Sequence, residues 1–134
     1  MTESVDPLRG KIILLIDTNE FLADFISKGL KLAGAQILGP ARSVNEANEL
    51  LSRLRSSPNA AVISVSAFEA TGFVAGDILA RLGVPMLLIA GTTRTLMPST
   101  FRHRVLTTPF AAYQVVDHVC AILRTGATQQ NITD

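Results

Sequence analysis

Lys11-Ile-Ile-Leu-Leu-Ile-Asp17 is an uninterrupted aliphatic run that ends at an acid. A short run of this kind, without polar alternation, is typical of a strand that is covered on both faces. From Asn19 onward the apolar residues recur at helical spacing instead, and Gly34 is well placed to end that helix. The chain therefore begins its fold with a buried strand followed by a helix.

The same alternation continues along the rest of the sequence. Further strands are predicted at residues 35–40, 60–65, 85–90 and 104–106. Helices are predicted from the capping box of Ser43 and Glu46, near residues 72–82, around 94–102, and after Pro109. Strands joined by crossovers long enough for a helix imply a parallel sheet with helices on both faces. The expected fold is a flavodoxin-like α/β three-layer sandwich, with five strands in the order 2-1-3-4-5 and about five helices.

Composition indicates one globular domain. The 134 residues are 48% apolar and 17% charged, and Cys120 is the single cysteine, so neither a disulfide nor a thiolate metal cluster is expected. The first residues lack the apolar core of a signal peptide, and no run approaches the length of a membrane span. We therefore expect a cytoplasmic protein that does not contact the membrane.

Charge is distributed unevenly. The formal net charge of +1 gives no case for nucleic-acid binding. Residues 1–90 carry eight basic and nine acidic side chains, whereas residues 91–124 carry four arginines against one aspartate, a net charge of +3. This mildly basic last third is suited to contact with an acidic protein surface.

Little charged chemistry stands at the carboxyl ends of the predicted strands, where ligands gather in open α/β sheets. These ends offer Asp17, Ser64, Ala90 and Thr108, that is one carboxylate, two hydroxyls and a methyl group. Asp17 with Glu20 or Asp24 would hold a cation weakly at best, and the simpler interpretation is that Asp17 caps the following helix.

Three segments resemble the CheY-like receiver domain of bacterial two-component response regulators. They are the first strand with Asp17, the turn and second strand at residues 33–41, and Val105-Leu-Thr-Thr-Pro-Phe110. The resemblance covers nearly the whole chain, so residues 11–124 are expected to form the receiver-like domain. Residues 1–10 would be an N-terminal extension and residues 125–134 a polar C-terminal tail.

The resemblance implies where phosphorylation chemistry should lie. Receivers phosphorylate themselves on an aspartate with the help of magnesium and a lysine, which neutralise charge on the phosphoryl group in transit. Aligning the segments places these roles on Asp17 and Thr18, on Ser64 for the acceptor, on Ala90, and on Thr108, which precedes Pro109. Only Asp17 retains the expected chemistry.

Four departures that converge on one pocket predict a pseudo-receiver that keeps the fold and has lost the chemistry. A serine hydroxyl without a nearby base is a weak nucleophile, and Ser64 lacks the Gly-x-Ser-x-Gly elbow. The two histidines, His103 and His118, have no spacing that suggests a triad. We therefore expect no enzymatic activity, no cofactor and no bound metal.

Function is then expected to lie in protein contacts. In receivers the last third of the fold mediates dimerisation and partner binding, which by resemblance makes the segment 94–124 the expected interface. The candidate residues are Arg94, Arg102, Arg104, Tyr113 and His118. The expected partners are a histidine kinase, a phosphotransfer protein, another regulator or a second copy.

Too few residues follow Leu123 for an output domain, so we expect a stand-alone module. The alternative is a small-ligand sensor that uses the vacated pocket.

Overall fold

Five strands form one parallel sheet in the computed structural model, which describes residues 6–53, 57–66, 79–90, 103–108 and 110–125. The strands are β1 (Ile12–Ile16), β2 (Gln36–Ala41), β3 (Ala60–Ser64), β4 (Met86–Ala90) and β5 (His103–Thr107). Their order across the sheet is β2-β1-β3-β4-β5. The predicted flavodoxin-like fold and strand order are confirmed, with strand bounds that differ from the prediction by a residue or two.

The central strands are buried along almost their whole length, which explains their continuous apolar character. Every residue of β3 is buried, and the last four residues of β1 are buried. The ladder between β1 and β3 runs from Ile13 opposite Ala60 to Ile16 opposite Ile63. On the other side of β1, the register with β2 shifts between Leu14 and Ile16. Strands covered on both faces need apolar side chains in both directions.

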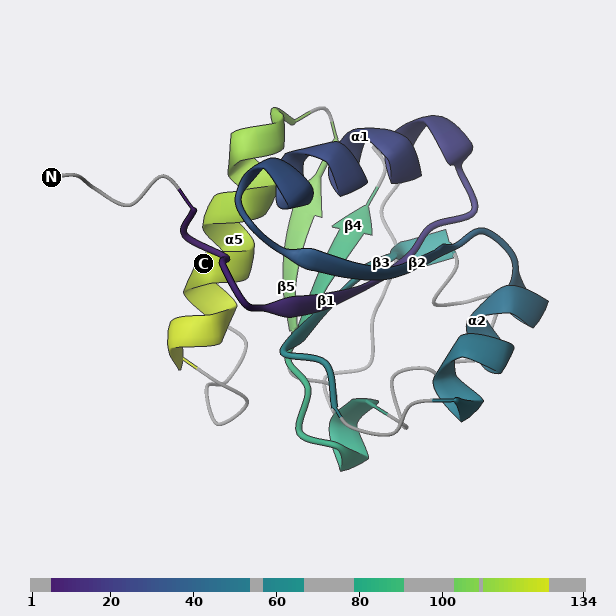
Figure 1. Ribbon diagram of the computed structural model, residues 1–134. Helices are drawn as coiled ribbons and strands as arrows, with labels where there is room; N and C mark the ends of the chain where they lie inside the picture. The colour runs from purple at the N-terminus through teal and green to yellow at the C-terminus, as the bar shows by residue number, and fades with distance from the viewer. Residues whose placement is uncertain (1–5, 54–56, 67–78, 91–102, 109, 126–134) are drawn as a thin grey trace, which may run out of the picture.

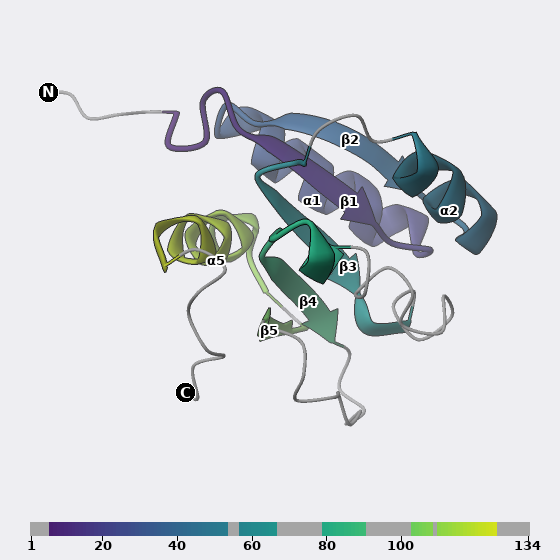
Figure 2. The same ribbon diagram turned by 90° about the horizontal axis from the view of Figure 1, so that it is seen from below.

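Helices cover both faces of the sheet. Helices α1 (Glu20–Leu32) and α5 (Ala112–Thr125) lie side by side on one face, and α2 (Val44–Ser52) lies on the other (Figures 1 and 2). Alternate residues of each strand therefore enter different cores: Leu14 and Ile63 pack on the α2 side, whereas Leu15 and Val62 pack beneath α1 and α5.

The N-terminal turn before β1 belongs to the packed structure. Leu8 is completely buried in the core beneath α1 and α5. Its backbone N–H donates to the carbonyl of Ala33 at 2.8 Å. Gly34, at φ +100°, leaves room for this turn, because a Cβ there would lie 3.0 Å from backbone atoms of Arg9. Residues 6–10 thus close the amino end of the sheet.

Part of the predicted helical structure falls outside the described residues. Of the helix predicted near 72–82, residues 79–81 are described and helical, and Gly83 follows them at φ +75°. The helix predicted around 94–102 and the tail from residue 126 lie outside the description. Among the described helices, none has the length and apolar character needed to cross a membrane.

Candidate functional site

The carboxyl ends of four neighbouring strands bring the candidate residues to one edge of the sheet. Asp17 directly follows β1, Ser64 ends β3 and Ala90 ends β4. Ser64 lies opposite Ile89 in the ladder between β3 and β4. Thr108 follows β5, and its backbone N–H donates to the carbonyl of Ala90 at 2.9 Å. The structure therefore gathers the residues that the sequence placed at strand ends.

Asp17 is held from two sides of the sheet edge. Its side chain is only 2% exposed. Its backbone N–H donates to the carbonyl of Ala41 at 3.0 Å, and its Oδ1 accepts from the backbone N–H of Asn19 at 2.9 Å. Asn19 in turn caps α1, because its Oδ1 accepts from the N–H of Leu22 at 3.0 Å. The helix cap is therefore Asn19, and Asp17 instead fixes the turn that leads into the helix.

The second carboxylate oxygen of Asp17 has no hydrogen-bond partner of standard geometry among the described residues. Oδ2 is buried and accepts no hydrogen bond from the described part of the chain. Burial raises the pKa of the Asp17 carboxyl, while the hydrogen bond from Asn19 and the Ser64 side chain lower it by less. Desolvation penalises the charged form, so the folded protein favours a protonated Asp17 more than water does.

Ser64 lies beside Asp17 at this edge of the sheet. The Ser64 side chain lowers the pKa of the Asp17 carboxyl. Ser64 Oγ also lies 3.5 Å from Ser66 Oγ. An acid is therefore near the serine, contrary to the expectation of a hydroxyl with no base close by. Ser64 is itself almost fully buried, which restricts the approach of an electrophile.

A hydrated magnesium ion does not fit the side chains at this edge. Magnesium prefers octahedral oxygen coordination and keeps several waters, which requires accessible carboxylates. Here one Asp17 oxygen is engaged by Asn19 and the other is buried, and the next residue is Thr18, an exposed hydroxyl. Asp24 is engaged by Arg42 at 3.1 Å. Within the described ranges, no group of three or more acidic, histidine or cysteine side chains is arranged to hold a metal.

The predicted partner interface is described only in part. Arg94, Arg102 and Pro109 lie outside the described residues. Arg104 lies in β5 opposite Leu87, but the description does not extend to its side chain. Tyr113, in the first turn of α5, is 67% exposed.

Two further residues of this face differ in their exposure to solvent. His118 is half-buried and already interacts with its surroundings. Val105 is 45% exposed on β5. Tyr113 and Val105 are thus the large apolar side chains that are exposed on the described part of this face.

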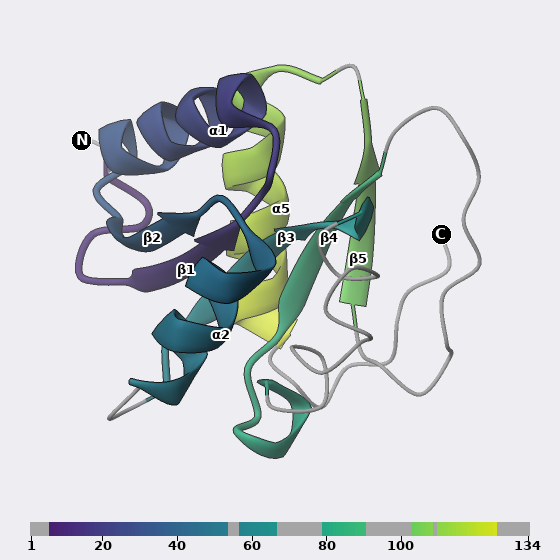
Figure 3. The same cartoon turned by 90° about the vertical axis from the view of Figure 1, so that its right-hand side faces the viewer.

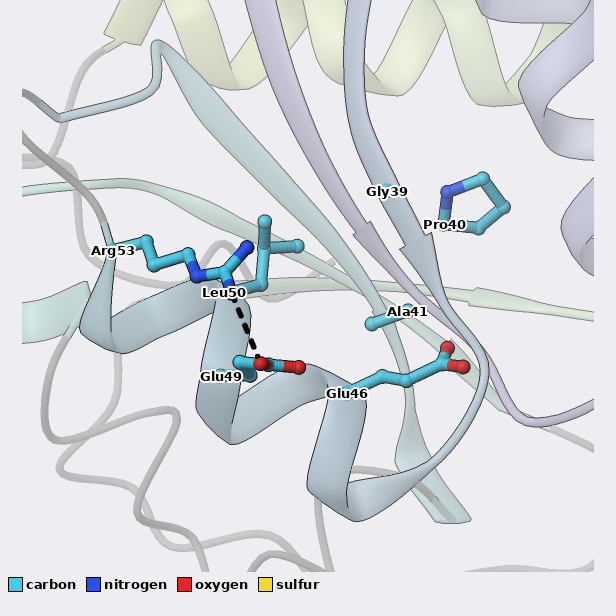
Figure 4. A pocket seen from close by; sticks show the side chains of 7 residues that line it. All are labelled: Gly39, Pro40, Ala41, Glu46, Glu49, Leu50 and Arg53. Carbon is cyan, nitrogen blue, oxygen red and sulfur yellow. Dashed lines mark hydrogen bonds and ion pairs between the residues drawn. The ribbon is translucent and has the colours of Figure 1, made fainter.

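A separate hollow of about 160 Å³ lies between β2 and α2 (Figure 4). It is lined by residues 39–41 and by Glu46, Glu49, Leu50 and Arg53. Glu49 and Arg53 form an ion pair at 3.1 Å, and Glu46 Oε1 accepts from the backbone N–H of Arg42 at 2.7 Å. Its charged groups therefore already have partners, and none of the candidate residues at the sheet edge lines it.

Comparison with known proteins gives structural matches without sequence matches. No protein-family model matches the chain, and no curated protein sequence matches it. The N-terminal domain of a response regulator/sensory box/GGDEF three-domain protein from Carboxydothermus hydrogenoformans matches with a TM-score of 0.72 at 16% identity, over 86% of this chain and 95% of that one. A response regulator receiver protein from Burkholderia phymatum matches with a TM-score of 0.70 at 21% identity, over 85% and 95%.

The response regulator PhyR from Brucella abortus matches with a TM-score of 0.67 at 19% identity, over 91% of this chain. The match covers 52% of the PhyR chain, so this chain spans about half the length of that regulator. Together these likenesses show that the chain has the fold of response regulator receiver domains.

Proposed function

We propose that this chain is a pseudo-receiver, which acts in bacterial two-component signalling through protein contacts and without phosphorylation of an aspartate. The observation that carries the proposal is Ser64 at the end of β3, the position at which the resemblance puts the acceptor aspartate. Asp17, the carboxylate that remains at this edge, is buried and engaged by Asn19.

The chemical argument rests on charge. Phosphoryl transfer proceeds by positioning the phosphoryl group and neutralising its negative charge. Thr108 and Ala90 bring no positive charge to the sheet edge, and the Ala90 methyl donates no hydrogen bond. The donor set around Asp17 does not suit magnesium. Nucleophile, cation and metal site are therefore all missing from the places where the resemblance expects them.

The proposed partners are a histidine kinase, a phosphotransfer protein, another regulator or a second copy, met in the cytoplasm. The segment 94–124 is the proposed docking face. Among its described side chains, Tyr113 is the largest exposed apolar group. Aromatic residues are enriched in the energetically important centres of interfaces. Tyr113→Ala is therefore expected to weaken partner binding with little effect on stability.

Incubation with magnesium and labelled acetyl phosphate, read by intact mass, tests the loss of phosphorylation. We expect no adduct, while a phosphorylatable receiver in the same tube becomes labelled. A base-labile adduct that disappears in Asp17→Asn, or an acid-stable one that disappears in Ser64→Ala, would overturn the proposal.

A second variant tests whether the acceptor carboxylate is the single group that phosphorylation lacks, or one of several. Ser64→Asp returns the acceptor carboxylate alone and leaves Thr18, Ala90 and Thr108 in place. We expect it to remain unlabelled, because the metal site and the cation are still absent. Labelling of this variant would mean that the rest of the pocket is competent.

One observation favours a second candidate function, a small-ligand sensor at the same edge. Asp17 Oδ2 is a buried acceptor without a partner among the described residues, and an unpartnered buried acceptor costs about 1–3 kcal/mol. A ligand with a hydrogen-bond donor would remove that cost. A thermal-shift screen of metabolites tests this: stabilisation that is lost in Asp17→Ala supports the sensor, and a screen without stabilisation removes it.

A further inference from the structure

The outer face of α1 carries apolar side chains on the side opposite its core contacts. The buried residues of the helix are Ala23, Ile26, Ser27 and Leu30. Phe21 is 78% exposed and Leu32 is 82% exposed. No described helix or strand covers this side of α1 (Figures 1 and 3). The helix therefore carries two large apolar side chains that its own fold does not cover.

Phe21 and Leu32 lie on one line along the helix. They are eleven residues apart, which is about three turns and ~16 Å of helix. Lys28 falls between them in sequence and lies about 20° from Phe21 and about 40° from Leu32 around the helix. We call Phe21, Lys28 and Leu32 the outer stripe. An aligned pair of large apolar groups at the two ends of a helix suits a second helix laid along it.

Exposed charges beside the outer stripe change sign along the helix. Glu20 and Asp24 stand in the first half, and Lys28 and Lys31 stand in the second half; all four are exposed. Asp24 also pairs with Arg42, but that pair is solvent-exposed and leaves the Asp24 side chain 65% accessible. A helix that is acidic at its start and basic at its end is complementary to an antiparallel copy of itself.

From this pattern we infer that α1 forms a self-complementary, antiparallel contact with α1 of a second copy of the chain. A twofold axis across the middle of the helix would set Phe21 of each copy against Leu32 of the other. It would also set the acidic half of each helix beside the basic half of its partner, as an isologous interface requires. A parallel arrangement would place like charges together, so the charge pattern selects the antiparallel one.

The small area of the contact limits the affinity of the dimer. Thirteen residues make a helix of only ~20 Å, which presents far less than the roughly 800 Å² that each partner buries in a stable complex. The dimer is therefore weak and depends on concentration and on salt. This inference goes beyond the proposed function and does not depend on whether the pocket is phosphorylated.

Two charge variants with opposite signs test the contact in sedimentation velocity of the full chain. One combines Glu20→Lys with Asp24→Lys, and the other combines Lys28→Glu with Lys31→Glu. Each should self-associate about tenfold more weakly than the wild type, because attraction becomes repulsion at every pair. Mixing the two should restore association, since each variant then meets the opposite charge. The paired swap Glu49→Lys with Arg53→Glu rearranges charges on α2, away from the proposed contact, without changing the net charge, and should behave like the wild type.

Removing the apolar ends provides an independent readout. Phe21→Ser combined with Leu32→Ser should abolish self-association while circular dichroism shows an unchanged fold, because both side chains are exposed. A wild type that stays monomeric over a hundredfold concentration range would overturn the inference. So would a dimer that ignores the α1 variants, which would assign association to another face such as residues 94–124.

Discussion

Asp17 shows how one buried acidic side chain can fix the backbone at the edge of a sheet. Its Oδ1 accepts from the backbone N–H of Asn19 at 2.9 Å, which holds the turn that leads from β1 into α1. The sequence predicted a carboxylate at the sheet edge and a capping role for it. It did not reveal that Oδ2 would be buried without a partner, because burial depends on how β2 and β3 pack around it.

The buried Asp17 carboxyl should make stability depend on pH. Its pKa is raised above 3.8 by burial, so the folded state holds the proton more tightly than the unfolded chain does. The contribution of Asp17 to the free energy of unfolding is therefore greatest below pH 3.8 and falls as the pH rises through the raised pKa. Asp17→Asn should remove that decline and stabilise the protein at neutral pH by on the order of 1 kcal/mol.

Urea unfolding of wild type and Asp17→Asn across the acid-to-neutral range measures this difference. The difference in free energy of unfolding between the wild type and Asp17→Asn should grow as the pH rises. Asp117→Asn removes an exposed carboxylate and serves as the control for a simple change of net charge. A constant gap at every pH would show that the effect is one of packing and not of charge.

At the scale of helices and strands, the sequence predicts those elements that follow from the local spacing of apolar residues and from helix caps. The five strands and the helices at α1, α2 and α5 follow from apolar spacing and caps, and Ser43 and Glu46 form the expected start of α2, with Ser43 Oγ accepting from Glu46 N–H at 3.1 Å. What pattern could not show is how helices touch each other. Gly29 looks like an unfavourable helix residue in sequence, yet it faces Ala112 across the contact between α1 and α5.

Capping of α1 by Asn19 should be measurable in isolation. The side-chain oxygen of Asn19 satisfies the N–H of Leu22, one of the four donors that a helix start leaves free. Asn19→Ala should lower the free energy of unfolding by about 1 kcal/mol, whereas Asn19→Ser should retain most of the stability. Chemical denaturation of the two variants tests this, and equal losses would show that the side-chain oxygen is not the cause.

The contact between Gly29 and Ala112 should appear as coupling between two substitutions. A Cβ on residue 29 would lie 3.0 Å from the Ala112 Cβ, closer than methyl groups pack comfortably. Gly29→Ala should therefore destabilise the protein despite the better helix propensity of alanine. Ala112→Gly should relieve the contact, so the double variant should recover about 1 kcal/mol relative to the sum of the single changes. Additive effects would mean that the helices separate freely.

For the whole molecule, the limit of the sequence lies in contacts between distant segments. The strand order could be predicted because right-handed crossovers allow few topologies for five alternating strands. The place of Leu8 could not, since it stands alone before the first strand, outside any periodic run. In the structure it fills the core beneath α1 and α5, so the packed part of the chain begins ahead of residue 11.

Leu8 should therefore act as a core residue and not as part of a loose extension. It is 0% exposed, and its turn is tied to the end of α1 through the carbonyl of Ala33. Leu8→Ala should lower the free energy of unfolding by about 2–5 kcal/mol, because it leaves a cavity between the sheet and two helices. Leu32→Ala removes the same atoms from a side chain that is 82% exposed and should change stability by less than about 0.5 kcal/mol. Equilibrium unfolding of both variants decides the matter: if the two losses were equally small, the N-terminal turn would contribute nothing to the stability of the sheet.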